Sequence, residues 1–519
     1  MNAREPRPAV LAAMSLVALL AFPIAAALAG SPLYQIKVTV VGEGSVSLDP
    51  YRTGYQKNNI VTLTAIPAPG TDSTFDRWSG AVSGTQNPIT LRVAGNAAVT
   101  ATFVDPGSGG GSERPPLPAS KMIVGYFAQW AIYQRNYLVK NVETSGAADA
   151  MNVMNYAFAS IDANLHCASL DTFADYGKAF SASESVDGVA DTYSQPLKGN
   201  FNQILKLKAR HPQLRVLLSL GGWTESYRFS DAALPANRAA FVKSCIDTFM
   251  GGNAAGVFDG FDIDWEYPGS CGNTCNWRPE DRDNFPALLE EFRRQLDELA
   301  AKVPAGTTPP HYLLTVAAPA GVATYSVMNL AAMHGPLDWI NVMAYDFHGP
   351  WELNGPANHA AALYQSTCEP AGGDWGDKAI QAYLGAGVPA AKLLLGVPFY
   401  GHGWRGVAAV DYGFCQPASG LARGVYERGT NDYKVLDGQA RPERFDAATA
   451  AHWSFNGSEF WSFDDTDTMK LKADYVNNPT RPLRGMMFWE LSGDTTVITD
   501  GGRLVKAMRS SLGQPPVGP

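Results

Sequence analysis

The chain has no excess of basic residues and, beyond its first 29 residues, no long hydrophobic run. Its 40 Lys and Arg are outnumbered by 49 Asp and Glu, which gives a net charge of −9 over 519 residues. A nucleic-acid-binding protein needs a basic surface, and a membrane span needs roughly 20 apolar residues. We therefore expect neither nucleic acid nor a membrane among the partners of the mature chain.

Cysteine is also scarce, with six residues at Cys167, Cys245, Cys271, Cys275, Cys368 and Cys415. A structural zinc site needs two clustered pairs. Only Cys271 and Cys275 lie close together in the chain, so we expect no metal. In an oxidising compartment this pair can form a local bridge, and Cys368 can pair with Cys415. Cys245 lies in a helical pattern, and we expect it to be a buried thiol.

The hydrophobic run that the chain does have lies at its N-terminus. Arg4 and Arg7 precede an apolar stretch over residues 9–22, and Ala27-Leu28-Ala29 follows it. This order is typical of a secretory signal peptide, here over residues 1–29. The alternative is a membrane anchor, but this stretch of 14 residues is short for a span of ~20. We therefore expect a secreted, extracellular protein.

Residues 33–104 contain short alternating segments separated by turn residues, which predicts a small all-β module. This segment resembles the β-repeat modules of secreted bacterial proteins. Its single tryptophan, Trp78, could bind carbohydrate, but a core position is favoured because small domains need every large apolar side chain. A Gly/Ser/Pro linker over residues 105–120 follows the module.

From residue 121 to 512, apolar runs alternate with amphipathic helical patterns, which favours a parallel α/β architecture. The clearest helical pattern, over 279–302, has acids at its start and one apolar face. Eight alternating strands predict a (β/α)8 TIM barrel. The connection over 401–482 is too long for one helix and predicts an α+β insertion between strands seven and eight. The candidate strands are residues 122–129, 151–161, 215–220, 257–266, 312–318, 339–346, 392–398 and 484–489.

Three acids alternate with apolar residues in the fourth candidate strand. Asp262, Asp264 and Glu266 would share one face of a strand, because strand side chains alternate with period two. Several buried carboxylates are costly unless they are paired, protonated or used. The alternative is a structural acid cluster or a metal site. Asp259 has the opposite parity, and we expect it to support the start of the strand.

The spacing of Asp259, Asp262, Asp264 and Glu266 resembles the Asp-x-x-Asp-x-Asp-x-Glu signature of glycoside hydrolase family 18, the chitinases and their relatives. Three further motifs appear in the order that this family shows. They are Ser219-Leu-Gly-Gly222 after the third strand, Met343-Ala-Tyr345-Asp346 after the sixth, and Trp489 at the end of the eighth. A barrel enzyme builds its site at these C-terminal strand ends. The resemblance covers roughly residues 121–512, least securely in the insertion.

The resemblance implies a substrate-assisted, retaining mechanism, an exception among glycosidases. Glu266 would be the general acid, and the 2-acetamido oxygen of the substrate would attack the anomeric carbon to give an oxazolinium intermediate. Asp264 would hold the acetamide N–H. Asp262 would crowd Asp264 so that the pair shares a proton and Glu266 stays protonated. Tyr345 would hydrogen-bond the acetamide carbonyl, and no cofactor is needed.

Aromatic residues near the strand ends are candidates for stacking on the apolar faces of sugar rings. Trp489 would form the floor beneath the distorted sugar with Tyr126 beside it, and Trp351 resembles the aromatic that binds the leaving sugar. Surface packing of a loop is the alternative for each outer tryptophan. The expected substrate-binding set is Tyr126, Trp130, Gly222, Trp223, Met343, Asp346, Trp351, Trp404 and Trp489, with Asp259 and Ser219 as structural support.

The chain departs from the family pattern after the seventh strand. Many relatives have Tyr-Gly-Arg there, whereas this chain has Tyr400-Gly401-His402. An arginine contact to substrate would then be absent or come from Arg405.

The sequence therefore predicts a secreted chitinase that hydrolyses β-1,4-linked N-acetylglucosamine polymers. We expect a monomer whose partner is chitin or a chito-oligosaccharide. One alternative is an endo-β-N-acetylglucosaminidase that acts on N-glycans. The other is a chitin-binding lectin that does not cut, although such proteins typically lose one of the acids that are present here.

Overall fold

A computed structural model describes residues 32–41, 44–68, 74–104, 117–118, 121–303, 308–496 and 501–514. The signal peptide expected over 1–29 lies outside these residues, as does most of the linker expected over 105–120. The chain divides into two compact units, Met1–Ser112 and Glu113–Pro519. Within the described residues, no helix is both long enough and apolar enough to cross a membrane.

The first unit is the all-β module that the alternating pattern predicts. One sheet has the strand order β1 (Ile36–Val41), β6 (Ala97–Val104), β4 (Thr74–Gly80), and the other has β2 (Gly44–Asp49), β3 (Ile60–Pro67), β5 (Ile89–Arg92). Trp78 is buried among Leu63, Val99 and Phe103, and its indole N–H donates to the Gln86 carbonyl at 3.1 Å. Its core position is thus confirmed.

The second unit is built on a closed ring of eight parallel strands. Each strand pairs with the next around the ring, and pairing between β8 and β10 and between β21 and β7 completes it. The eight candidate strands and the TIM-barrel architecture are confirmed. The strands are β7 (Met122–Ala128), β8 (Val153–Ile161), β10 (Arg215–Gly221), β11 (Gly260–Asp264), β12 (Leu313–Pro319), β13 (Trp339–Met343), β14 (Leu393–Pro398) and β21 (Gly485–Trp489).

Helices connect the strands of this ring. The helical pattern over 279–302 forms α6 (Asp281–Ala300), which buries Leu288, Leu289 and Phe292 on its apolar face. Asp281 and Asp283 lie in its first turn, where negative charge offsets the helix dipole. The other longer helices are α1 (Val139–Thr144), α3 (Gly199–Arg210), α5 (Arg238–Phe249), α9 (Gly376–Gly385), α11 (Thr466–Val476) and α12 (Arg503–Ser511). The short ones are α2 (Ala147–Ala150), α4 (Phe229–Ala232), α7 (Val322–Tyr325), α8 (Leu330–Met333) and α10 (Tyr433–Asp437).

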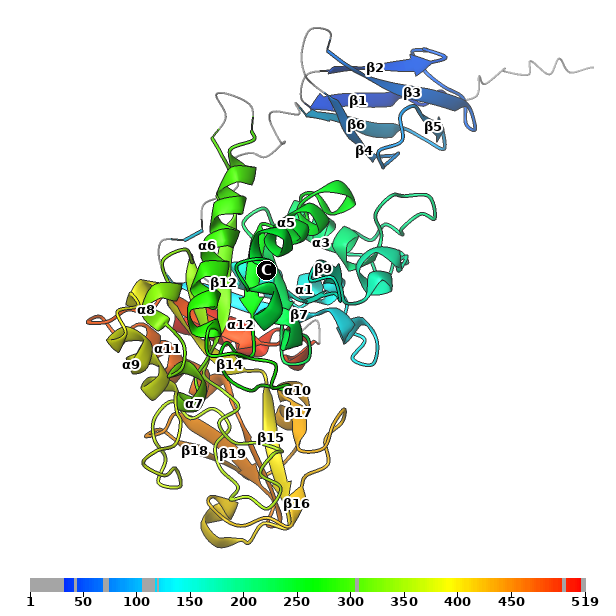
Figure 1. Ribbon diagram of the computed structural model, residues 1–519. Coiled ribbons are helices and arrows are strands. Elements are labelled where there is room, and N and C mark those ends of the chain that lie inside the picture. Colours follow the sequence, from blue (N-terminus) through cyan, green and yellow to red (C-terminus); the bar gives the residue numbers. More distant parts are fainter. Residues whose placement is uncertain are drawn as a thin grey trace, which may run out of the picture. The chain divides into compact units, whose positions relative to one another are not determined.

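An antiparallel sheet lies between β14 and β21 in the chain and forms the lower part of Figure 1, in yellow and orange. Its strand order is β16 (Gly420–Leu421), β15 (Tyr400–Arg405), β20 (Glu459–Phe463), β19 (Ala451–Phe455), β18 (Glu443–Asp446), and β17 (Thr430–Asp432) pairs with β15. With α10 it forms the α+β insertion. The expected range of 401–482 also includes α11, which packs against β14 and β21 of the barrel.

All six cysteines are in disulfides, one of which was not expected. Cys271 pairs with Cys275, and Cys368 pairs with Cys415. The expectation that Cys245 is a free buried thiol is wrong, because it pairs with Cys167. Cys245 lies on α5, which packs against the short strand β9 (Cys167–Ser169). This proximity depends on the tertiary fold.

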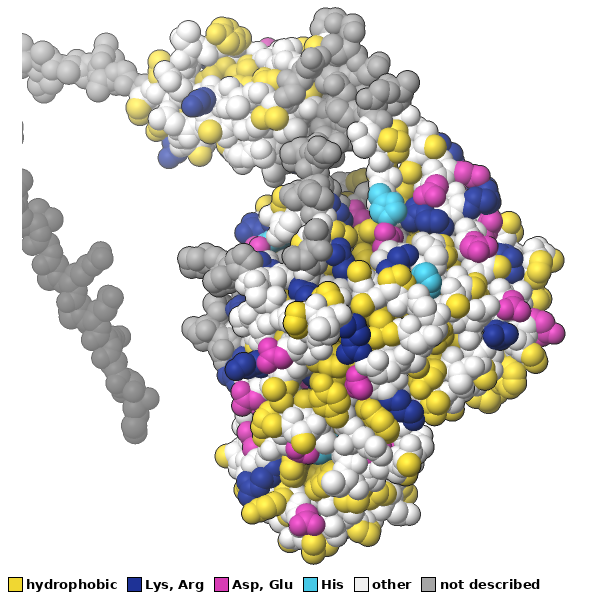
Figure 2. Space-filling model, turned by 90° about the vertical axis from the view of Figure 1, so that its left-hand side faces the viewer, with side chains coloured by type: hydrophobic (Ala, Val, Ile, Leu, Met, Phe, Trp, Pro, Cys, Tyr) yellow, Lys and Arg dark blue, Asp and Glu magenta, His cyan; other side chains and the backbone are white. Residues whose placement is uncertain are grey.

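Charged side chains of both signs are mixed on the face of the protein that Figure 2 shows, where Lys and Arg lie among Asp and Glu. Opposite charges also pair along exposed helix faces, as between Arg294 and Glu298 on α6. Such exposed pairs contribute little to stability.

Candidate active site

The acid row lies at the C-terminal end of β11, in the centre of the barrel mouth. Asp262 stands opposite Ser219 of β10 and Thr315 of β12 in the strand register. β11 ends at Asp264, so Glu266 lies in the loop that follows rather than on the strand. The structure therefore places Asp262 and Asp264 inside the ring and Glu266 at its rim.

Asp262 is buried and accepts hydrogen bonds from four strands. Tyr126 and Ser219 donate to its Oδ2 at 2.6 and 2.9 Å, and Thr315 and Asn341 donate to its Oδ1 at 2.5 and 3.2 Å. Burial raises the pKa of Asp262, and all four donors oppose this shift. The pKa of Asp262 stays above its usual value because burial outweighs the support that these hydrogen bonds give to the charged form.

Asp264 has a different environment. Its side chain is nearly buried, with the residue 4% exposed, and its Oδ1 has no hydrogen-bond partner among the described residues. Burial, followed by the charges of Glu266 and Asp262, raises its pKa well above the usual value. A buried carboxylate oxygen without a partner costs free energy. Asp264 is therefore ready to accept a hydrogen bond from a ligand.

The sharing of a proton between Asp262 and Asp264 stays a prediction. Both oxygens of Asp262 already accept donors, and no hydrogen bond joins the two aspartates in the described part of the chain. After burial, the charge of Glu266 is the largest influence on the pKa of Asp264. Glu266 is therefore the neighbour whose charge most disfavours ionisation of Asp264.

Glu266 is partly buried and is positioned through its backbone. Its N–H donates to Ser226 Oγ at 2.9 Å, and that hydroxyl contacts the carbonyls of Gly222 and Asp264 at 2.8 and 3.1 Å. Burial raises the pKa of Glu266 to about 7, a hydrogen bond from Tyr267 opposes the shift, and the charge of Asp346 adds to it. A carboxyl group with this pKa can both donate and accept a proton near neutral pH.

Tyr345 and Asp346 follow β13 and face the acid row. The charges of Asp264, Asp346 and Glu266 add to burial in raising the pKa of Tyr345 well above its usual value, so its hydroxyl stays a donor. Its oxygen lies 3.9 Å from Met487 Sδ. Asp346 accepts the Tyr400 hydroxyl at 2.7 Å.

The residue in place of the family's arginine, His402, does not reach outward from the site. It is buried, and its Nε2 lies 2.8 Å from Asp346 Oδ1. Its ring lies 5.6 Å from that of Trp351 and 5.4 Å from that of Tyr400. Arg405, the alternative source of an arginine contact, lies at the far end of β15 beside Gly420.

An aromatic cluster forms the floor next to the acids. The Trp489 ring lies 5.3 Å from that of Tyr126, 5.5 Å from Phe158 in a stacked arrangement and 6.2 Å from Trp130. Trp130 is 40% exposed. Gly222 has a φ of +83°, and a Cβ there would lie 2.5 Å from the Phe158 ring. Gly222 therefore makes room for the floor. Met343 packs against the same cluster.

Two further tryptophans expose broad apolar surfaces. Trp223 follows β10, is 52% exposed and lies 6.5 Å from the Tyr267 ring. Trp351 is 59% exposed and packs against His402. Exposed indoles backed by other rings are suited to stacking on sugars.

Trp404 does not belong to this set. Its residue is 0% exposed, its ring packs against Phe460, and its N–H donates to the Glu352 carbonyl at 2.8 Å. The expected stacking role is wrong, because β15 continues through Trp404 and points it into the core of the insertion.

Replacing Trp404 with Ala is expected to destabilise the insertion. Removing a buried Trp typically costs about 3–5 kcal/mol of unfolding free energy, and it also leaves the Glu352 carbonyl without its donor. Trp223→Ala is the matched control, because an exposed aromatic should change the unfolding free energy by less than about 0.5 kcal/mol. Urea unfolding of the two variants measures the difference. Equal stability of the two would contradict the buried position.

Asp259 supports the strand start, as its parity suggests. Its Oδ2 accepts the Val216 N–H at 2.7 Å, and its Oδ1 lies 3.0 Å from Lys208 Nζ. Asp259 directly precedes β11, so these contacts hold the start of β11 against β10. Ser219, the other expected support, donates directly to Asp262.

Several residues of the site were missed in the sequence. Phe158, Thr315 and Asn341 lie within barrel strands, and Tyr400 begins β15 just after β14, so their places in the candidate strands were an available signal. Ser226 begins a short 3-10 helix (Ser226–Arg228) and Tyr267 lies in a loop, and neither carried such a signal. In the part of the chain that the structure describes, no three potential metal ligands are grouped to hold an ion.

Comparison with known proteins places this geometry in a family. The family model described as glycosyl hydrolases family 18 matches residues 122–494, and the divergent InlB B-repeat domain matches residues 34–106. The chain is 41% identical to chitinase C of Streptomyces lividans and 40% identical to chitinase 63 of Streptomyces plicatus. These matches cover 75% and 81% of this chain but only 60% and 64% of those relatives' length.

Two solved structures give the same result for the fold. The catalytic domain of a psychrophilic chitinase B from Arthrobacter superposes with a TM-score of 0.70 at 38% identity, over 78% of this chain and 98% of the other. Chitinase from Bacillus thuringiensis superposes with a TM-score of 0.66 at 32% identity, over 76% of this chain and 70% of the other. The chain belongs to glycoside hydrolase family 18.

Proposed function

We propose that the protein is a chitinase that hydrolyses β-1,4-linked N-acetylglucosamine polymers with retention of anomeric configuration. The observation that carries the proposal is Asp264, a buried carboxylate with an unpartnered oxygen beside Glu266, whose pKa is about 7. An N-acetyl sugar supplies what this arrangement lacks, namely an amide N–H for Asp264. The names of the family 18 relatives support the same substrate class.

The first step begins with Glu266 protonated. Glu266 gives its proton to the glycosidic oxygen while the substrate's acetamide oxygen attacks the anomeric carbon, and the leaving sugar departs. Asp264 accepts the acetamide N–H and offsets the positive charge of the oxazolinium ring. Tyr345 donates to the acetamide oxygen, and Trp489 forms the apolar floor.

The second step consumes water. Water attacks the anomeric carbon from the face that the leaving sugar vacated. Glu266, now ionised, takes a proton from this water molecule. The ring opens, the acetamide is restored, and Glu266 regains its proton. The four donors to Asp262 hold its carboxyl in place through both steps.

The remaining assignments extend this proposal. Trp130, Trp223 and Trp351 would stack on sugar units along the cleft. The segment over 1–29 would direct secretion, and the linker over 105–120 would join the 33–104 module to the catalytic domain over 121–512.

Release of reducing ends from colloidal chitin tests the proposed activity. Wild-type protein is expected to release chito-oligosaccharides, and proton NMR of the first products should show the β-anomer in excess. Ribonuclease B with its N-glycan is the parallel substrate. Release of glycan from ribonuclease B without chitin cleavage would favour the endo-N-acetylglucosaminidase. Binding to chitin without new reducing ends would leave a lectin.

A further inference from the structure

Trp351 lies on a turn in the long connection between β13 and α9. The Glu352 N–H donates to the Gly349 carbonyl at 3.0 Å and closes the turn. A Cβ at Gly349 would lie 2.5 Å from the Trp351 ring and 2.9 Å from that of His402, so the indole packs closely over the backbone. Trp404 holds the Glu352 carbonyl from the insertion. These contacts hold the Trp351 indole against its own turn. The indole then has a fixed position only if the turn itself is fixed.

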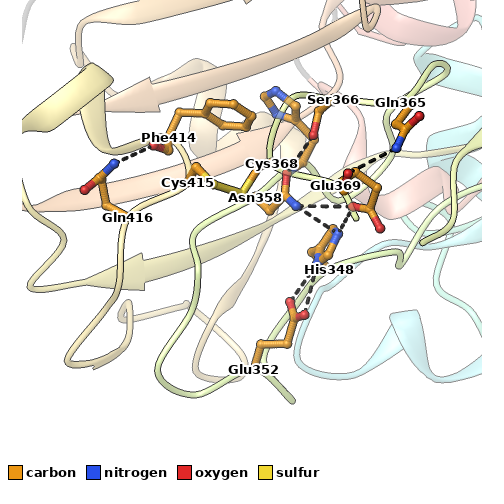
Figure 3. The surroundings of a disulfide bond; sticks show 11 residues. His348, Glu352, Asn358, Gln365, Ser366, Cys368, Glu369, Phe414, Cys415 and Gln416 are labelled. Carbon is orange, nitrogen blue, oxygen red and sulfur yellow. Dashed lines mark hydrogen bonds and ion pairs between the residues drawn. A yellow bond between two sulfur atoms is a disulfide. The ribbon is translucent and has the colours of Figure 1, made fainter. Parts of the chain in front are cut away.

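His348 brackets this turn together with Glu352, as Figure 3 shows. Its Nδ1 lies 3.0 Å from both carboxylate oxygens of Glu352, and its Nε2 lies 2.5 Å from Glu369 Oε2. The side chains of His348 and Glu369 are only 12% and 8% exposed. Both ring nitrogens face carboxylates, and Nε2 also lies 3.0 Å from Asn358 Nδ2. Both nitrogens can donate to the carboxylates at once only in the charged imidazolium.

The second carboxylate connects the turn to the insertion. Glu369 directly follows Cys368, which forms a disulfide with Cys415 (Figure 3). Asn358 Nδ2 lies 3.3 Å from Glu369 Oε2, and the Asp374 N–H donates to Glu369 Oε1 at 3.2 Å. Glu369 is thus held from three sides. Because His348 contacts Glu369 and lies at the start of the turn, this contact fixes the position of the turn.

We propose that His348 is a positioning residue whose imidazolium, held between Glu352 and Glu369, fixes the Trp351 turn and thereby strengthens binding of long substrate chains. This inference rests on the proposed function. Loss of the charge leaves two glutamates facing a neutral ring that can donate only once. His348 then loses its hydrogen bond to either Glu352 or Glu369. The turn is held less firmly, and Trp351 stacks less well on a sugar.

The ionisation of the neighbouring groups agrees with this role. Burial lowers the pKa of His348, but hydrogen bonds and charge from Glu352 and Glu369 outweigh burial and raise it above the usual value. His359 also lies close enough to interact, but burial lowers its pKa to about 3, so it is neutral. The affinity contributed by the turn should therefore be present below the pKa of His348 and fall as pH rises through it.

A double-mutant cycle between His348 and Trp351 tests the proposal. His348→Gln should raise KM for chitohexaose by about three- to tenfold, the scale of one aromatic contact, with kcat on 4-methylumbelliferyl chitobioside unchanged. In a Trp351→Ala background the same change should have no further effect on KM. Additive effects of the two substitutions would overturn the proposal.

The control is His311→Gln, because His311 also pairs with a carboxylate, Asp338, at 2.6 Å, but is largely exposed and precedes β12 at the opposite end of the barrel. Its KM should equal that of wild type.

A pH series separates positioning from a general structural role and serves if His348→Gln does not fold. In wild-type protein, KM for chitohexaose should rise with pH as His348 loses its proton. In Glu369→Gln the same rise should begin at lower pH, because one of the charges that raise the pKa of His348 is gone. An unchanged midpoint would contradict the proposal. If wild-type protein cleaved no chitin substrate, the proposed function itself would fail instead.

Discussion

Replacing Glu266 with Gln is expected to lower kcat on chito-oligosaccharides by about 10²–10⁴-fold, the usual contribution of general acid–base catalysis. Gln keeps the shape of the side chain but cannot donate a proton to the glycosidic oxygen. KM should change little, since Trp489 and Asp264 remain in place. Steady-state hydrolysis of chitohexaose measures both constants.

The control for this variant is Glu298→Gln, an isosteric change at a side chain of α6 that is 61% exposed. It should retain wild-type kcat. Retention of wild-type kcat by Glu266→Gln as well would refute the assignment of the acid.

The same carboxyl should set the alkaline limb of the wild-type pH profile. Its folded pKa of about 7 lies above the value of 4.5 for a free Glu, so the protonated acid is lost as pH rises through about 7. The raised pKa also means that the ionised form destabilises the fold. Glu266→Gln should therefore be more stable than wild type above pH 7, and this advantage should vanish as pH falls toward 4.5.

Replacing Asp264 with Asn is expected to lower kcat by about 10²–10³-fold, similar to the loss of one preorganised electrostatic contact. The amide can still contact the acetamide group, but it no longer offsets the charge of the oxazolinium ring. Since burial and two neighbouring carboxylates disfavour the ionised aspartate, the variant should unfold at a higher temperature than wild type. Chitohexaose kinetics and thermal unfolding check the two effects.

Asp247→Asn provides the matched control for Asp264→Asn, because the side chain of Asp247 is 60% exposed and forms a surface ion pair with Lys243 on α5. It should leave kcat unchanged. A reduction of less than tenfold in Asp264→Asn would show that the charge of Asp264 contributes little to the transition state.

The barrel and its acid row could be predicted because both depend on local pattern. Buried parallel strands are nearly continuous apolar runs, and the period of two assigns Asp262 and Asp264 to one face. The position of Glu266 needed more than this pattern. β11 stops at Asp264, and the place of Glu266 depends on a hydrogen bond to Ser226, which is 40 residues away in the chain.

Trp404 and Cys245 show where sequence reasoning fails. Trp404 follows a barrel strand as Trp351 does, but the chain continues from β14 almost directly into β15, whose neighbours in the insertion bury the indole. The pairing of Cys245 depends on the packing of α5 against β9. In both cases the deciding neighbour is remote in sequence, so neither composition nor spacing carries the information.

The four donors to Asp262 come from β7, β10, β12 and β13, which together span much of the ring. Trp130, Trp223 and Trp351, which we propose to stack on further sugar units, stand by contrast on separate connections after β7, β10 and β13. Exchanging the loops that carry these tryptophans could therefore change the length of oligosaccharide that is cut. The hydrogen bonds and protonation of the buried acids would be unaffected. Conversely, a substitution at Ser219, Thr315 or Asn341 would alter the chemistry and leave the preference for length intact.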